Sequence, residues 1–170
     1  MTECLIIGAG PSKSLLEGYI PDIFTICPNL HYPTANILVA IDEPIVKDII
    51  KNYQQPLFTT LYWKERYLLH PRVFSIEPKD YFGTGSYSSG LRAVALATLF
   101  NFSKIYLSGF DFYKKNTEKY IKEFRQIKQS NIKYIKIDFE TAEEQPWFDK
   151  LISLEEFKNE FRKIKRGNCS

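Results

Sequence analysis

The sequence predicts an α/β fold: a single Rossmann-like, doubly wound domain with a mostly parallel central sheet and helices on both faces. Short apolar runs alternate with helical patterns along the chain, which is the order of a βαβ architecture. The runs are continuously apolar, as in strands that are buried on both faces of a parallel sheet. A chain of 170 residues with 44% hydrophobic residues can form one such core. We therefore expect one domain over residues 1–170.

The first predicted strand covers residues 4–7 and runs into the turn GAGPS at residues 8–12. Ser12 can cap a helix over residues 13–17. A strand that enters a helix in this way leaves free backbone amides, which suit an anion. The turn lacks the third glycine of the dinucleotide fingerprint and the Gly-Lys ending of a P-loop. A structural turn and a phosphate cradle therefore both remain open.

The next part of the chain carries further apolar runs with helical patterns between them. We expect strands over residues 23–27, 36–41, 57–61 and 72–76, and helices over residues 45–52 and 63–69. Residues 77–87 are rich in turn formers and predict a loop.

The stretch at residues 88–113 is the expected centre of the fold. Its predicted helix, residues 91–100, is polar only at Arg92 and Thr98, so it must be covered on several sides. The strand after it, residues 104–108, delivers residues 109–113 to its carboxyl end, where open α/β sheets bind ligands. We expect the functional site there.

The C-terminal part predicts a helix over residues 116–130, a strand over residues 134–138 and an acidic loop over residues 139–146. An amphipathic helix over residues 153–166 begins at the capping box SLEE.

Composition limits the function classes. A net charge of +3 mildly favours anionic ligands such as nucleotides but does not indicate a nucleic acid. The three cysteines have no metal-like spacing, and no apolar run approaches 18 residues, so we expect no membrane span. The first strand follows only three residues, which predicts no secretory signal and a cytoplasmic protein. The basic C-terminal helix leaves a homo-oligomer open.

Four segments in order resemble a known family: IIGAGPS at 6–12, CPN at 27–29, LVAIDEP at 38–44, and SSGLRAVALATLFNFSKIYLSGFDFY at 88–113. Together they resemble the bacterial sialyltransferases of glycosyltransferase family 42. They also resemble the related 6-hydroxymethylpterin diphosphokinase-like family. The resemblance covers roughly residues 3–120. It implies a Rossmann-like fold in which these segments surround a nucleotide.

The resemblance implies roles for the first three segments. Gly8, Ala9 and Gly10 approach the phosphate or sugar of the donor, within the loop that Ser12 completes. Asn29 binds the donor. Asp42 takes the position of a donor-binding Asn in the sialyltransferases, and an acid there is more like the diphosphokinases.

The last segment supplies the remaining implied roles. Ser89 and Gly90 place a hydroxyl and a backbone amide on the donor, where helix amides stabilise phosphate charge. Phe112 and Tyr113 line the base and phosphate pocket. Tyr113 and Tyr120 resemble the paired tyrosines that help the phosphate leave, although both can equally be core aromatics.

Two charged residues of this segment have two interpretations each. Arg92 lies in the first turn of the predicted helix, where a cation is disfavoured unless an anion is near. It either contacts the ligand or pairs with a local carboxylate. Asp111 either caps a turn or serves as a catalytic carboxylate of the site.

The chain departs from the sialyltransferases in its catalytic base. They use a histidine downstream of the tyrosines, and this chain has only His31 and His70, both upstream of Tyr113. The candidate bases that remain are His31 and four carboxylates at positions 42, 111, 138 and 140.

Three functions follow. The first is a small glycosyltransferase that uses a nucleotide-activated sugar, most simply a CMP-sugar, without a cofactor. The second is a diphosphokinase or phosphoryl transferase in which Asp42 and Glu43 hold Mg²⁺-ATP. The third is a non-catalytic nucleotide-binding module.

Overall fold

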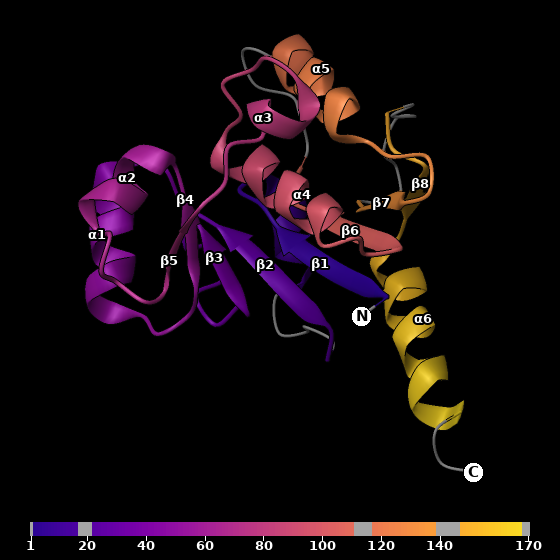
Figure 1. Ribbon diagram of the computed structural model, residues 1–170. Coiled ribbons are helices and arrows are strands. Elements are labelled where there is room, and N and C mark those ends of the chain that lie inside the picture. Colours follow the sequence, from indigo (N-terminus) through magenta and orange to yellow (C-terminus); the bar gives the residue numbers. More distant parts are fainter. Residues whose placement is uncertain (1, 17–21, 111–116, 139–146, 168–170) are drawn as a thin grey trace.

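The computed structural model describes residues 2–16, 22–110, 117–138 and 147–167. Its centre is one sheet of eight strands, all parallel, in the order β5-β4-β3-β2-β1-β6-β7-β8 (Figure 1). The strands are β1 (Glu3–Ile7), β2 (Phe24–Pro28), β3 (Ile37–Val39), β4 (Leu57–Thr59), β5 (Val73–Ser75), β6 (Lys104–Ser108), β7 (Lys133–Ile137) and β8 (Lys150–Ile152). The predicted α/β fold class is confirmed.

The connections between the strands are mostly helical. The helices are the 3-10 helix η1 (Pro11–Leu16), α1 (Glu43–Asn52), α2 (Leu61–Arg66), α3 (Lys79–Phe82), α4 (Ser89–Leu99), α5 (Thr117–Ile127) and α6 (Leu154–Gly167). Of the helices that the structure describes, none is long and apolar enough to cross a membrane.

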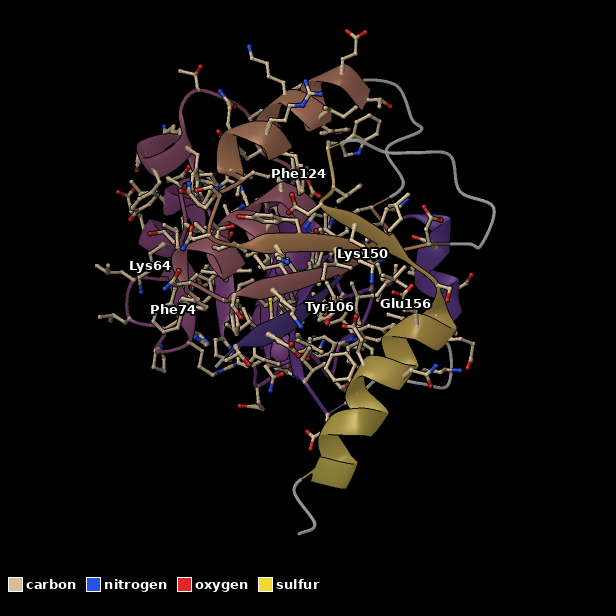
Figure 2. All side chains as sticks on the ribbon, turned by 90° about the vertical axis from the view of Figure 1, so that its right-hand side faces the viewer. Lys64, Phe74, Tyr106, Phe124, Lys150 and Glu156 are labelled. Carbon is tan, nitrogen blue, oxygen red and sulfur yellow. The ribbon has the colours of Figure 1, made fainter. Side chains whose placement is uncertain are left out.

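Alternate residues of each strand pack against different helix layers. In β1, Cys4 and Ile6 belong to the cluster that contains the side chains of α4 and α5, whereas Leu5 and Ile7 belong to the cluster that contains Phe157 of α6. A third cluster, with residues of α1 and α2, covers the other half of the sheet. Figure 2 shows Phe124 of α5 on one side of the sheet and Tyr106 of β6 on the side of α6. Helices therefore cover both faces.

The strand order has its switch point at the centre. From β1 the chain moves outward strand by strand to β5, and it then returns through α4 to β6 on the other side of β1. In open α/β sheets ligands bind outside the carboxyl ends of the strands at such a switch point. Here that point lies beyond Ile7 of β1 and Ser108 of β6.

Helix α4 is the buried centre that its sequence predicts. All its residues from Leu91 to Thr98 are buried. The helix contacts β1, β2, β3 and α5 (Figure 1). The polar side chain of Thr98 is satisfied internally, since its Oγ1 donates to the carbonyl oxygen of Val94 and also contacts the hydroxyl of Tyr134 (both 2.9 Å).

The structure corrects the prediction at several elements. Strand β8 and helix α3 were not expected, and residues 79–82 of α3 lie in the predicted loop. The predicted helix over residues 13–17 is the 3-10 helix η1 instead. The predicted strand over residues 36–41 is shortened to Ile37–Val39. The predicted acidic loop over 139–146 lies outside the described residues.

Candidate functional site

A cavity of about 210 Å³ lies at the switch point, far more than the roughly 30 Å³ that one water molecule takes. Loops after β1, β2 and β6, the start of α4, and α5 surround it. The lining residues are Gly8, Ala9, Gly10, Pro28, Asn29, His31, Ser88, Ser89, Gly90, Leu91, Gly109, Phe110 and Tyr120. The cavity therefore has the position that the fold class favours for a ligand.

The loops after β1 and β6 are joined by backbone hydrogen bonds. The amide of Gly8 donates to the carbonyl oxygen of Ser108, and the amide of Gly10 donates to that of Gly109 (both 2.7 Å). Gly109 has a φ of +78°, and a Cβ added there would lie 2.5 Å from the carbonyl oxygen of Gly8. The close approach of the two loops therefore requires glycine at position 109.

The start of α4 forms a second wall. Ser88 caps the helix, because its hydroxyl accepts a hydrogen bond from the amide of Leu91 (3.4 Å). Ser89 is buried, and its hydroxyl has no hydrogen-bond partner among the residues that the structure describes. The first amides of a helix and its dipole attract negative charge, so this wall suits an anionic group.

The loop after β2 forms the third wall. Asn29 and Leu30 both have positive φ angles, +52° and +59°. The amide of Asn29 donates to the carbonyl oxygen of Val39 (2.9 Å), and the amide of Tyr32 donates to the Sγ of Cys27 (2.8 Å). The Oδ1 atom of Asn29 is buried without a partner in the described part of the chain. A buried oxygen of this kind is an acceptor available to a ligand.

Seven of the predicted site residues come together in this cavity: Gly8, Ala9, Gly10, Asn29, Ser89, Gly90 and Tyr120. They come from four separate segments of the chain, which meet only in the fold. Of the six other predicted residues, Asp111, Phe112 and Tyr113 lie outside the described residues, and Ser12, Asp42 and Arg92 lie outside the cavity wall. Phe110 lines the cavity as well; it lies in the segment 109–113 where the sequence predicts the site, but no role of its own was assigned to it.

Ser12 lies next to the cavity, but its hydroxyl binds the protein's own backbone. It is fully buried, and its Oγ accepts a hydrogen bond from the amide of Gly109 (2.9 Å). Its hydrogen bond therefore joins η1 to the loop after β6. The sequence had instead predicted that Ser12 caps a helix over residues 13–17.

Arg92 does not line the cavity. Its Nε donates to the carbonyl oxygen of Tyr87 (3.0 Å), its Nη1 donates to that of Ile76, and it forms an ion pair with Glu77 (3.4 Å). Of the two interpretations of Arg92, the structure contains the pair with a local carboxylate. The guanidinium holds the segment before α4 in place rather than lining the cavity.

Asp42 is also outside the cavity wall. It is the exposed residue at the N-terminus of α1, and the adjacent Glu43 pairs with Lys47 (2.5 Å). Across residues 2–16, 22–110, 117–138 and 147–167, no three His, Cys, Asp or Glu side chains gather as metal ligands. The Mg²⁺-ATP alternative stays a prediction.

The fold has a counterpart among solved structures. The chain is similar to the sialyltransferase CstII from Campylobacter jejuni, solved in complex with a substrate analogue, cytidine-5'-monophosphate. The TM-score is 0.55 at 20% sequence identity, over 80% of this chain and 79% of that one. No family model and no curated protein matches the sequence. The protein thus has a sialyltransferase-like fold, and the relation to the pterin diphosphokinases stays a prediction.

Proposed function

We propose that this protein is a glycosyltransferase that uses a nucleotide-activated sugar, most simply a CMP-linked sugar. The observation that carries the proposal is the cavity at the switch point, in which two buried polar groups, Asn29 Oδ1 and Ser89 Oγ, have no partner among the described residues. The similar sialyltransferase was solved with CMP, which supports a cytidine nucleotide as the ligand.

The chemistry of the cavity walls suits such a donor. The amides at the start of α4 and of the glycine loop would bind the phosphate. Ser89 and Asn29 would form hydrogen bonds to the phosphate, sugar or base, and Phe110 and Leu91 would contact the apolar faces of its rings.

Tyr120 would assist the leaving group. When the bond between the sugar and the phosphate oxygen breaks, negative charge develops on the phosphate. Helix amides aimed at that charge stabilise the transition state. The Tyr120 hydroxyl in the cavity wall would donate a hydrogen bond or a proton to the departing oxygen. Tyr113 would share this role, as the resemblance implies.

Ligand binding is tested by thermal unfolding of the full chain with CMP, CDP, UDP, GDP and ATP, each with and without Mg²⁺. We expect CMP and CDP to raise the Tm without Mg²⁺. At one hundred times Kd the stabilisation is about 2.7 kcal/mol, which is several degrees for a chain of this size. No shift with either cytidine nucleotide would overturn the proposal, and a shift with ATP only in Mg²⁺ would favour the diphosphokinase.

Catalysis is tested by hydrolysis of CMP-sialic acid, in which water replaces the unknown acceptor. We expect Tyr120→Phe to lower kcat at least tenfold while the CMP-induced Tm shift stays, because only the proton donor is lost. Tyr62→Phe, an exposed tyrosine on α2, is the matched control and should behave as wild type. Tyr113→Phe in the same assay tests the second tyrosine.

A further inference from the structure

Sugar transfer to a hydroxyl acceptor needs a group that takes the acceptor's proton. None of the four carboxylates that the sequence offers as a base lies in the described part of the cavity wall. Asp42 is exposed at the start of α1, and Asp138 pairs with Lys136, both outside that wall. Asp111 and Glu140 lie outside the described residues.

His31 stands in the wall itself. It lies on the loop after β2, next to Pro28 and Asn29, which also line the cavity. Of the described lining residues, it is the one whose side chain carries a basic nitrogen, and Tyr120 is the other titratable group. None of those described residues is a carboxylate.

The backbone before His31 is held in a costly conformation. Leu30 has a φ of +59°, which an L residue with a bulky side chain rarely adopts, and Asn29 precedes it at +52°. The amide of His31 closes the turn on the carbonyl oxygen of Pro28 (3.4 Å). Such strain is kept where the surrounding structure fixes a side chain for a purpose. The turn places His31 in the cavity wall.

We propose that His31 is the general base of the transfer reaction. The acceptor oxygen attacks the anomeric carbon of the donor sugar, and its proton passes to the imidazole. The bond between that carbon and the phosphate oxygen breaks, and its electron pair leaves with CMP. His31 then releases the proton to solvent. This inference rests on the proposed transferase function and replaces the base that the sequence lacks downstream of the tyrosines.

The surroundings of His31 keep its imidazole in the neutral form, which can accept a proton. Burial, and then the positive charge of Lys13 on η1, lower the pKa of His31 below its ordinary value. Beneath the loop, burial raises the pKa of Cys27 to about 11, so this thiol brings no negative charge at neutral pH. Tyr120 faces the same cavity from α5. The neutral form therefore dominates at pH 7, and activity should fall as the pH drops through the lowered pKa.

The main test measures kcat/KM for CMP-sialic acid hydrolysis between pH 4.5 and 8.5 in His31→Gln. We expect a loss of about 10²- to 10⁴-fold at pH 7.5 and no acidic limb in the profile, with the CMP-induced Tm shift unchanged. His70→Gln is the matched control, since His70 lies outside the cavity and its Nδ1 accepts from the amide of Arg72 (3.4 Å). This variant should retain both rate and profile.

Two further variants separate a base from a merely structural residue. Added imidazole should restore activity to His31→Ala in proportion to its neutral form. Lys13→Met removes a positive charge that disfavours imidazolium, so it should move the acidic limb to higher pH.

A kcat/KM of His31→Gln within twofold of the wild-type value would overturn the role of His31 and leave the proposed transferase function intact. A wild-type protein that binds CMP but releases no sugar would overturn both.

Discussion

At the scale of a single residue, Ser89 carries a buried polar group that lowers the stability of the protein. Its hydroxyl is buried without a hydrogen-bond partner among the described residues, at the start of α4. A buried hydroxyl that has lost water and gained no partner is destabilising. Under the proposed function, a ligand in the cavity would supply the missing partner.

We therefore predict that Ser89→Ala leaves the free energy of unfolding unchanged or raises it slightly, while CMP binds about tenfold more weakly. The loss corresponds to about one hydrogen bond to a ligand. Denaturation with and without CMP measures both quantities. Ser88→Ala is the contrast, because it removes the α4 cap and should cost about 1 kcal/mol of stability. Equal losses of stability in the two variants would contradict the prediction.

For Arg92 we expect the opposite result, a loss of stability without a loss of CMP binding. Its buried guanidinium contacts two backbone carbonyl groups and Glu77, outside the cavity wall. Arg92→Met leaves those acceptors unpaired, and we expect a loss of about 3 kcal/mol in urea denaturation. The CMP-induced Tm shift should remain. Arg125→Met, an exposed arginine on α5, should change stability by less than about 0.5 kcal/mol. Loss of CMP binding in a folded Arg92→Met protein would instead support a ligand contact.

At the level of elements, the site depends on how closely the loops after β1 and β6 approach. Hydrogen bonds join Gly8 to Ser108 and Gly10 to Gly109, and Ser12 holds the amide of Gly109 from η1. Because three elements share this junction, a single side chain placed in it would affect all of them.

Gly109→Ala puts a Cβ 2.5 Å from the carbonyl oxygen of Gly8, at a φ of +78°. We expect a loss of more than about 2 kcal/mol and of CMP binding, because the strain and the clash add. Gly90→Ala is the matched control, since its Cβ would meet Phe110 at 3.4 Å, an ordinary contact, inside a helix. It should fold at least as stably as wild type. A Gly109→Ala protein of wild-type stability would show that the loops can separate.

Elements also show where sequence reasoning fails. The long buried helix α4 and the strand β6 were predicted because their apolar pattern is local and strong. Strand β8 has three residues, and it is defined by pairing with β7 rather than by its own pattern. Helix α3 has four residues, too few for a period to be read. Short elements that tertiary contacts stabilise leave little local signal.

For the molecule as a whole, the two faces of the sheet differ in the helices that cover them and in their relation to the cavity. The face under α4 and α5 leads to the cavity, whereas α6 covers the opposite face around Tyr106, where Phe157 packs against that ring at 5.1 Å between centroids. No described residue of α6 lines the cavity. The residues that pack α6 against the sheet are therefore distinct from the residues that line the cavity.

Phe157→Ala should cost about 3–5 kcal/mol, because it empties a fully buried aromatic site, while the Kd for CMP in the folded protein stays the same. Phe74→Ala makes the same truncation on the exposed side of edge strand β5 and should cost clearly less. Calorimetry gives stability and affinity on one sample. A weaker Kd in Phe157→Ala alone would show that the two faces are coupled.

The sequence by itself determined the fold class, the buried helix and the glycine turns. Those features depend on local patterns: an apolar run, a turn residue, a Ser-Gly pair before a helix. Asn29 and Tyr120 in the cavity wall were implied only by the resemblance to the sialyltransferases. The tertiary structure alone decided the strand order, the partner of Arg92, the task of Ser12 and the place of His31 beside Asn29 and Ser89. These depend on which distant segments pair across the sheet, and no local pattern in a single sequence encodes that choice.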